Sequence, residues 1–552
     1  MKNHDGTGVS RRLLLRAVGA GSAITLLRAA PGRAQSKPPA KPTGQIVAGI
    51  SQEPTVFNPL LVHIEVDEGV YMNLFSPLWS VDPQGRFIPE LATEIPSSEN
   101  GGISEDGLNW RVKLRSGVVW HDGTPFTADD VKYSLDLIND KDFPAGTRTG
   151  HELVRDVTVV SPTEVTWKME KAFAPYPSIL AWTFIVPKHL LSAESDPRKP
   201  KFASAPVGTG PFKWQDRVPG DHITLVASDK FFGSGPHVER LVFKYIPDLT
   251  VLYTQFRTGD IDYIGLQGIT ADHYGEAKTL PGRKVVVAPQ PFIENYAFNL
   301  ARPEFADPVV RHALYASTDK DTIIKEIYYG LMSESESFLP KQSWAFNPQL
   351  PKHQYDPDAA KRMLDEAGWK PGAGGVREKN GARLEFTSST TAGNHLREQV
   401  QQFLQQGWQD VGAKMTIKNL PPAVMWGDYW VQSQFDTGVV GIDFMSGPDP
   451  EVSDYFRSTA CPAKGGSGQN TFQYANPEVD TLLTQGGTTL DQGARAPIYR
   501  RIQELVRNDL PVLPLFQYAL VEGTKDKLVG HAPNVNVRSN CWNMRDWYWQ
   551  SA

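Results

Sequence analysis

Apolar and polar side chains alternate along several short stretches in the first half of the chain. A period of two is typical of a strand that buries one face. Two further runs are continuously apolar and flank a loop rich in Gly and Pro. We therefore predict strands at residues 44–50 and 108–119, two short ones within 157–167 on either side of Ser161–Thr163, and others at 225–226 and 241–243.

Helix signals follow, and most of them lie in the second half. Thr127 with Asp130 three residues later forms a capping-box pattern. Pro308 and Pro357 each follow an Asp, at the early helical position where the missing N–H does no harm. Residues 395–408 predict a longer helix that ends before Gly412. Strands and helices therefore interleave, which is an α/β pattern.

The N-terminal segment has a different character. Ser10–Leu14 carries two adjacent arginines, Ala17–Leu27 is apolar, and Gly32–Ala34 offers small residues for cleavage. The apolar run has about 11 residues, whereas a membrane span needs about 20. We predict a twin-arginine signal peptide at residues 1–34, removed after export, and a flexible Pro/Lys-rich leader at residues 35–43.

Composition narrows the possible partners. The chain of 552 residues has a net charge of −6 and no long basic tract, so we expect no nucleic-acid binding. Its length favours two or more lobes. The two cysteines, Cys461 and Cys541, lie far from the cleavage region. We therefore expect a soluble, periplasmic protein without a lipid anchor. In an oxidising compartment the two thiols form a disulfide or stay separate, and the sequence leaves both alternatives open.

Several motifs identify the chain as resembling one family. The strongest block runs from Asp106 to Val131, and Pro206–Phe212 is a second marker. The remaining matches are Glu53–Leu60, Val81–Gly85 with Pro89–Ala92, Thr258–Asp262, Phe305–Leu314, Tyr355–Pro357 with Glu366–Trp369, and Tyr474 with Asn476–Asp480. Together they resemble the extracellular solute-binding proteins of family 5, the dipeptide, oligopeptide and nickel class that serves ABC importers. Within the markers, His121 and Asp122 belong to a turn and are interpreted as structural.

This resemblance implies a fold and a way of working. The expected fold is α/β, a two-lobed, hinged periplasmic binding protein of type II and cluster C-like, with mixed sheets and an extra subdomain in the first lobe. Residues 44–285 would form lobe 1, residues 286–490 lobe 2, and residues 491–552 a C-terminal return to lobe 1. A ligand bound in the cleft would stabilise the closed form. A membrane permease of an ABC importer would then receive the solute from a monomeric protein.

The resemblance also implies where the ligand lies. Peptide members commonly meet the α-ammonium with an acid three residues before an Asp-Pro pair. Here the pair is Asp449–Pro450, but Ser446 stands where the acid is expected, and Asp443 is the nearest substitute. The predicted ligand-binding residues are Phe57, Asn58, Asn295, Tyr296, Trp426, Tyr429, Asp443, Phe444 and Asp449. The competing interpretation of Trp426 and Trp430, four residues apart, is one face of a core helix.

Alternatives to a peptide ligand stay open. The missing acid favours a non-peptide solute such as an opine or sugar derivative, and the family also includes nickel binders. The 12 histidines are scattered without ligand spacing on one helix, so a metal would need an organic carrier. The chain contains no Gly-x-Ser-x-Gly, His-Glu-x-x-His or phosphate-loop motif. We therefore expect no enzyme activity, no protein-bound metal and no cofactor; an exported hydrolase is the remote alternative.

Overall fold

A computed structural model describes residues 37–61, 63–194, 201–265, 268–445 and 447–550. Their contacts group residues 38–550 into one compact unit. The predicted signal peptide at residues 1–34 and Ser446 lie outside the described residues. Residues 37–43 contain no helix or strand, as the Pro/Lys-rich composition of the leader suggests.

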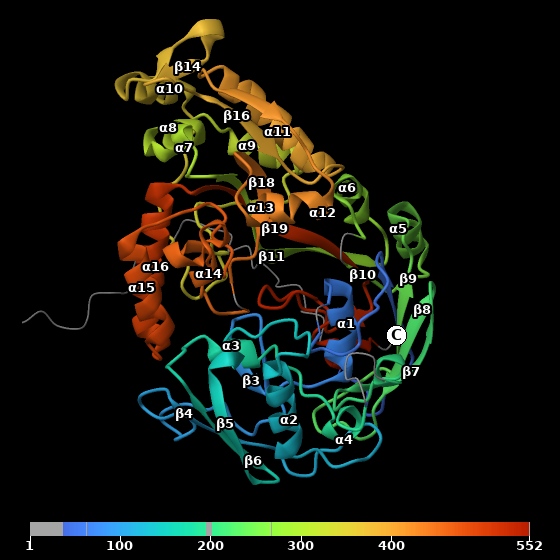
Figure 1. Ribbon diagram of the computed structural model, residues 1–552. Coiled ribbons are helices and arrows are strands. Elements are labelled where there is room, and N and C mark those ends of the chain that lie inside the picture. The colour runs from blue at the N-terminus through green and yellow to red at the C-terminus, as the bar shows by residue number, and fades with distance from the viewer. Residues whose placement is uncertain (1–36, 62, 195–200, 266–267, 446, 551–552) are drawn as a thin grey trace, which may run out of the picture. The chain divides into compact units, whose positions relative to one another are not determined.

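A long mixed sheet forms the frame of the molecule (Figure 1). Within the described residues it has 11 strands, parallel where β1 pairs with β9 and β10, and antiparallel where β11 pairs with β18 and β19. The order along the sheet is β17 (Lys414–Ile417), β16 (Glu385–Ser389), β18 (Thr437–Ile442), β11 (Arg283–Phe298), β19 (Val512–Lys525), β10 (Tyr263–Ile264), β1 (Gln45–Ile50), β9 (Arg240–Tyr245), β8 (His222–Ala227) and β7 (Phe212–Val218), with β12 (Ser333–Glu334) beside β19.

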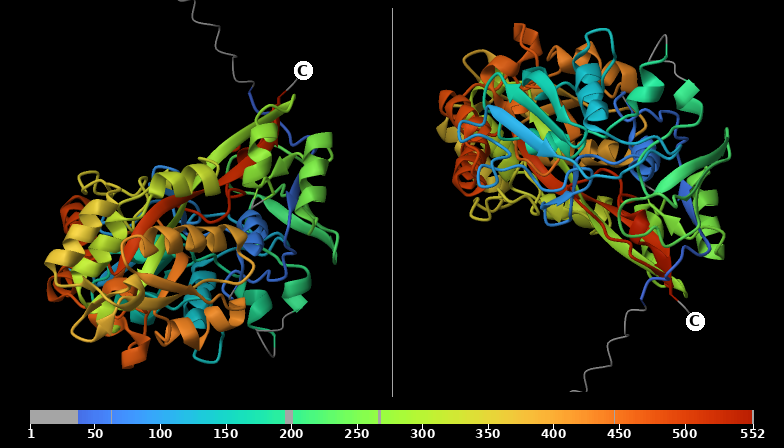
Figure 2. Two further views of the ribbon diagram at one scale, coloured as in Figure 1. Left: turned by 90° about the horizontal axis from the view of Figure 1, so that it is seen from above. Right: turned by 90° about the horizontal axis from the view of Figure 1, so that it is seen from below.

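Two long antiparallel strands, β11 and β19, connect the two halves of this sheet. They lie side by side along their length in Figure 2. Their register shifts between Pro289 and Ile293 and again between Glu294 and Asn295. A bulge adds a local bend and twist to a strand pair. The chain therefore passes from one half of the sheet to the other through a pair of strands bent near its middle.

A separate antiparallel sheet belongs to the first half of the chain. Its strands are β4 (Asn109–Lys113), β6 (Glu164–Met169) and β5 (Val154–Ser161). The tryptophans of β4 and β6, Trp110 and Trp167, stack at 5.6 Å in a core that also includes residues of helix α2 (Ala128–Asn139). The predicted strand at 108–119 is too long, because Gly117 adopts φ +75° and turns the chain after β4. Two smaller sheets pair β2 (Trp79–Val81) with β3 (Phe87–Pro89), and β13 (Lys370–Pro371) with β14 (Arg377–Lys379) and β15 (Ala382–Arg383).

The capping signals locate the helices well. Thr127 caps α2 in a capping box with Asp130, and Asp307 and Asp356 accept hydrogen bonds from the first turns of α8 and α10. The remaining helices are α1 (Glu65–Leu74), α3 (Tyr176–Leu180), α4 (Lys188–Leu191), α5 (Leu249–Thr258), α6 (Tyr274–Ala277), α7 (Pro303–Ala306), α8 (Pro308–Ala316), α9 (Lys320–Thr322), α10 (Pro357–Glu366), α11 (His395–Gln409), α12 (Pro422–Met425), α13 (Asp428–Val431), α14 (Ser453–Phe456), α15 (Pro477–Thr488) and α16 (Gln492–Asp509).

The C-terminal segment packs back onto the beginning of the chain. Leu528, Met544 and Trp547 share a hydrophobic cluster with residues of β1 and β9, and β20 (Leu528–Val529) pairs with β21 (Tyr548–Trp549). Helix α16, in contrast, packs with residues of α15 and β18. The predicted boundary at residue 491 thus falls before a helix that still packs with the second half.

The two cysteines stay apart. Cys541 is buried in the cluster around β1, whereas Cys461 is buried at the start of a short 3-10 helix, Pro462–Lys464. Both are free thiols, so the disulfide alternative is wrong and the separate-thiol alternative is confirmed. Burial raises the pKa of the Cys541 thiol to about 12.

Candidate functional site

A cavity with a volume of about 550 Å³ lies between distant parts of the chain. Pockets for small molecules commonly measure about 300–1,000 Å³. Four stretches of chain line it: residues 59–71, residues 138–183, residues 443–469 and residues 535–538, together with Pro291 in the bent part of β11. The cavity thus collects residues from both halves of the chain and from the C-terminal segment, as a cleft between two lobes must.

The first turn of α1 places three acids beside this cavity. Asp67 completes the start of the helix, since its carboxylate accepts the N–H groups of Thr55, Val56 and Ile64. Burial, followed by the charge of Glu68, raises the pKa of Glu65 to about 8. Glu68 faces the cavity with 1% of its surface exposed. Of the three, Glu68 is the acid available to the cavity.

Glu68 anchors a small polar cluster. Its Oε1 atom lies 3.0 Å from Nε2 of His63 and 3.6 Å from Nη1 of Arg538. Tyr71 places its hydroxyl 2.8 Å from the same His63 nitrogen. Burial opposes a charge on His63, but its hydrogen bonds to Glu68 and to the Leu61 carbonyl outweigh burial and raise its pKa. Arg538 keeps 55% of its side chain exposed.

Asp443 lies on the wall of the same cavity, directly after β18. Its Oδ1 accepts the Met445 N–H at 3.1 Å, and its carbonyl accepts the Tyr455 hydroxyl at 3.1 Å. Burial raises the pKa of the Asp443 carboxyl to about 6. The charge of Arg538 lowers this pKa, and the charge of Glu68 raises it. Phe444 follows on the wall and packs its ring 4.9 Å from that of Tyr455. Asp443 and Phe444, both predicted as ligand residues, therefore line this cavity.

Carboxylates outnumber cations around the cavity. Besides Glu68 and Asp443, the walls include Glu451 and Asp454, and burial raises the pKa of both. His151 is also present, but burial lowers its pKa to about 4, so it is neutral at pH 7. The cations are Arg538 and, when protonated, His63. The site is therefore suited to a solute with positively charged groups.

Other predicted residues lie in the core. Phe57 and Asn58 do not end the first strand, because β1 ends at Ile50; both are buried, and Phe57 packs at 4.9 Å against Trp214. Asn295 and Tyr296 are buried in β11, where the Tyr296 hydroxyl forms a hydrogen bond with that of Thr437. None of these four residues lines the cavity.

The aromatic candidates after β17 also lie elsewhere. Trp426 donates its ring N–H to Thr391 at 3.0 Å, and Tyr429 bonds Ser389 at 2.9 Å. Trp426 and Trp430 do touch, at 5.4 Å, but they belong to the ends of two short helices, α12 and α13, rather than to one helix. Neither Trp426 nor Tyr429 lines the cavity.

Asp449 is committed to a different partner. Its two oxygens accept hydrogen bonds of 2.6 and 2.8 Å from Arg495, and both side chains are buried. A carboxylate held in this bidentate pair has no free edge for a solute. Asp449, predicted as a ligand residue, thus holds the cavity-lining segment against α16.

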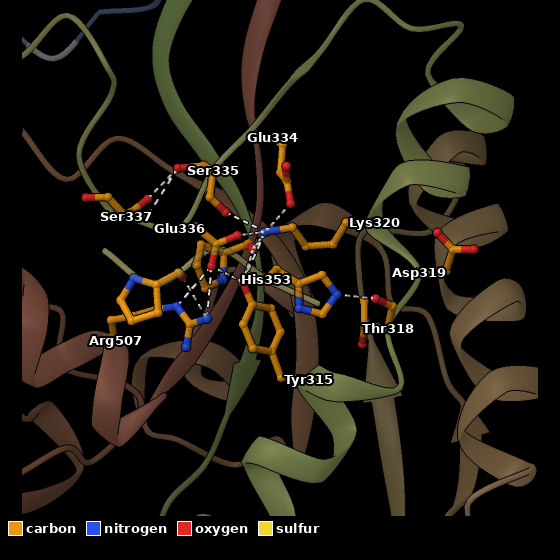
Figure 3. A network of polar contacts seen from close by, with 12 residues as sticks. Tyr315, Thr318, Asp319, Lys320, Glu334, Ser335, Glu336, Ser337, His353 and Arg507 are labelled. Carbon is orange, nitrogen blue, oxygen red and sulfur yellow. Dashed lines mark hydrogen bonds and ion pairs between the residues drawn. The ribbon is translucent and has the colours of Figure 1, made fainter. Parts of the chain in front are cut away.

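A second buried polar cluster lies in the other half of the molecule (Figure 3). Lys320 of α9 is 1% exposed and points at Glu336, Ser335 and Tyr315, with Nζ distances of 2.6, 2.6 and 3.0 Å. The Nε atom of Arg507 in α16 donates a hydrogen bond of 3.0 Å to the second carboxylate oxygen of Glu336. Burial alone would raise the pKa of Glu336, but the charges of Lys320 and Arg507 outweigh burial and lower this pKa. We name Lys320, Tyr315, Ser335, Glu336 and Arg507 the Lys320 network.

Two kinds of feature are absent from the residues that the structure describes. No group of three or more His, Cys, Asp or Glu side chains among them is arranged to hold a metal ion. None of their helices is both long and apolar enough to cross a membrane.

Comparisons with known proteins agree with this architecture. The oligopeptide-binding protein AppA of Bacillus subtilis is 27% identical over 519 residues, covering 92% of this chain and 91% of AppA. The solved structure of AppA in complex with a nonapeptide is 26% identical with a TM-score of 0.75, covering 93% of this chain and 100% of that one. NikZ of Campylobacter jejuni, solved with Ni(L-His), is 25% identical with a TM-score of 0.76, covering 91% and 99%.

The fold and the cavity together define a two-lobed α/β solute-binding protein. Residues 86–463 match the family described as bacterial extracellular solute-binding proteins, family 5. The chain belongs to this family, whose members are substrate-binding proteins.

Proposed function

We propose that the protein captures a short peptide or peptide-like solute in the 550 Å³ cavity and delivers it to the permease of an ABC importer. The observation that carries this proposal is the carboxylate of Asp443 on a cavity wall shared by both halves of the chain. A peptide α-ammonium bound there would replace the water that the carboxylate loses on burial. The similarity to an oligopeptide-binding protein, whose structure was solved with a nonapeptide, supports the same class of solute.

The cellular setting belongs to the same proposal. The twin-arginine pathway would export the protein, and residues 1–34 would then be removed. The mature protein would work in the periplasm as a monomer without a lipid anchor, where it can reach its permease. Lobe 1 would comprise residues 44–285 and the C-terminal return, and lobe 2 residues 286–490. Bending of β11 and β19 near their register shifts would close the lobes on the solute.

The test is a thermal-shift screen of the mature protein against di- to pentapeptides. A bound solute raises the melting temperature by mass action. A peptide shift that Asp443→Ala abolishes supports both the solute class and the site. A shift by an opine, a sugar derivative or nickel with histidine, without any peptide shift, would replace the peptide by that solute.

That second class has its own supporting observation. Ser446 stands where peptide-binding relatives are expected to carry an acid. A solute without a free α-amine would not need the acid at that position. N-acetylated peptides separate the two classes, because acetylation should abolish binding that depends on the α-ammonium.

A further inference from the structure

Glu68 differs from Glu451, another acid of the cavity wall, in how its two oxygens are hydrogen-bonded. Oε1 serves both His63 and Arg538, whereas Oε2 is buried without a hydrogen-bond partner in the described structure. Glu451, in contrast, uses both oxygens, for Tyr499 at 3.0 Å and for the Ser453 N–H at 2.7 Å. Buried polar atoms are normally hydrogen-bonded, so an unpaired carboxylate oxygen at a cavity wall indicates a missing partner.

The fold supplies no structural reason for this arrangement. Asp67 already satisfies the start of α1, and Glu65 has a pKa raised to about 8, so it is neutral at pH 7. The His63 and Arg538 side chains together compensate one oxygen of Glu68. An unsatisfied buried group costs about 1–3 kcal/mol, and more if it is charged. A bound cation would offset that cost more fully than a neutral donor, because a hydrogen bond between two charged groups is stronger than one with a neutral partner.

We propose that Glu68 forms a second cation-binding subsite in the cavity, so that the solute carries a positive group besides its α-ammonium. Resting on the proposed function, this inference specifies a basic peptide or peptide-like solute, with a lysine-, ornithine- or arginine-type side chain. The α-ammonium lies at Asp443, and the side-chain cation binds the Glu68 carboxylate, whose second oxygen turns from its buried position to accept a hydrogen bond. Arg538 is exposed beside Glu68 and partly neutralises its negative charge, so it limits the affinity of the subsite for a cation.

The test compares peptides that differ in one charge. The screen above selects the preferred peptide length, and lysine or norleucine is then placed at each position of an otherwise alanine peptide. Norleucine keeps the aliphatic chain and lacks the ammonium. Calorimetry should give roughly 10- to 100-fold tighter binding for lysine at one position, the range expected of a charge-assisted hydrogen bond.

Three variants separate the subsite from a structural role. Glu68→Gln should remove the preference for lysine while norleucine peptides still bind. Glu65→Gln is the matched control, since it makes the same change in the same helical turn at a group that is neutral at pH 7 and lies outside the cavity. Arg538→Gln should increase the preference, which a merely structural role for Glu68 would not produce.

The outcomes distinguish this inference from the proposed function. Equal binding of lysine and norleucine peptides by the unmodified protein overturns the subsite and leaves peptide capture standing. No binding of any peptide overturns the proposed function and the subsite with it. If Glu68→Gln fails to fold, the unmodified protein and Arg538→Gln still decide the question.

Discussion

The Lys320 network and the cavity wall around Glu68 are both buried and charged, but their partners differ. In the network, both oxygens of Glu336 are bonded, and Lys320 makes hydrogen bonds to a carboxylate, a carbonyl and a hydroxyl. At the cavity wall, one oxygen of Glu68 has no partner among the described residues. A complete network stabilises one arrangement of the fold. An incomplete one beside a cavity leaves room for a solute.

The largest expected effect is on the network. Lys320→Met leaves Glu336 with Arg507 as its main ionic partner and should destabilise the protein by about 3 kcal/mol, near the lower end for a broken buried pair. Peptide affinity should not change, because the network lies outside the cavity. Urea unfolding measures the first effect and calorimetry the second. Glu68→Gln should show the reverse pattern: binding of lysine peptides weakens, whereas the free energy of unfolding changes by less than about 1 kcal/mol. A similar stability loss in both variants would remove the contrast.

Two aspartates six positions apart give a sharper version of this comparison. Asp443→Asn should weaken peptide binding by roughly 10- to 100-fold, while the melting temperature at pH 7.5 rises. The rise follows because the pKa of Asp443, about 6, lies above its usual value, so ionisation of this carboxyl costs stability as the pH increases.

Asp449→Asn is the matched control for that variant. It leaves the buried Arg495 guanidinium without its bidentate partner, so the melting temperature should fall. Calorimetry and thermal unfolding of both variants in one buffer provide the comparison. If Asp443→Asn lowers stability as much as Asp449→Asn does, Asp443 is a structural residue and its assignment to the solute is wrong.

The same two residues show what the sequence could predict. Local signals were sufficient for most elements, because caps such as Thr127 and Asp307 and the alternation in residues 44–50 act over a few residues. The motif ending in Asp449–Pro450 identified the cavity-lining segment. It could not show that Arg495, 46 positions later, takes both oxygens of Asp449.

The missed site residues have the same cause. His63, Glu68 and Arg538 come together through contacts between α1 and a C-terminal segment 470 positions away from Glu68. Three acids in the first turn of α1 were a visible signal, but acids there are ordinary because the helix dipole favours them. Glu68 is distinguished by its place on the cavity wall and by its unpaired oxygen, and both are properties of the packed structure.

A smaller effect is expected from pH. Asp443 in the free protein should protonate below a pH of about 6, whereas a peptide α-ammonium, with a pKa of about 8, stays charged between pH 5 and about pH 7. Affinity should therefore be highest near pH 7, fall about tenfold at pH 5 because one proton competes with the solute, and fall again above a pH of about 8 because the α-ammonium itself loses its proton. Calorimetry at several pH values measures the slope, and Asp443→Asn should flatten it. Any remaining slope in that variant would come from His63, Glu451 and Asp454, whose pKa values are also raised at the cavity wall.

The smallest effect tests how closely the two sides of the cavity meet. A Cβ at Gly447, which has φ +62°, would lie 2.9 Å from Nε1 of Trp182 on the opposite side. Gly447→Ala should cost about 1 kcal/mol for the left-handed backbone, and the added contact should weaken peptide binding about threefold, because a wedge at this point opposes closure. Gly465→Ala is the matched control, since φ is +81° and no atom lies within 4 Å of its added Cβ. Both variants should lose similar stability in thermal unfolding, and only Gly447→Ala should lose affinity. Equal affinity in the two would mean that Trp182 moves aside without cost, so that the cavity wall adapts to its solute at this position while the Lys320 network does not.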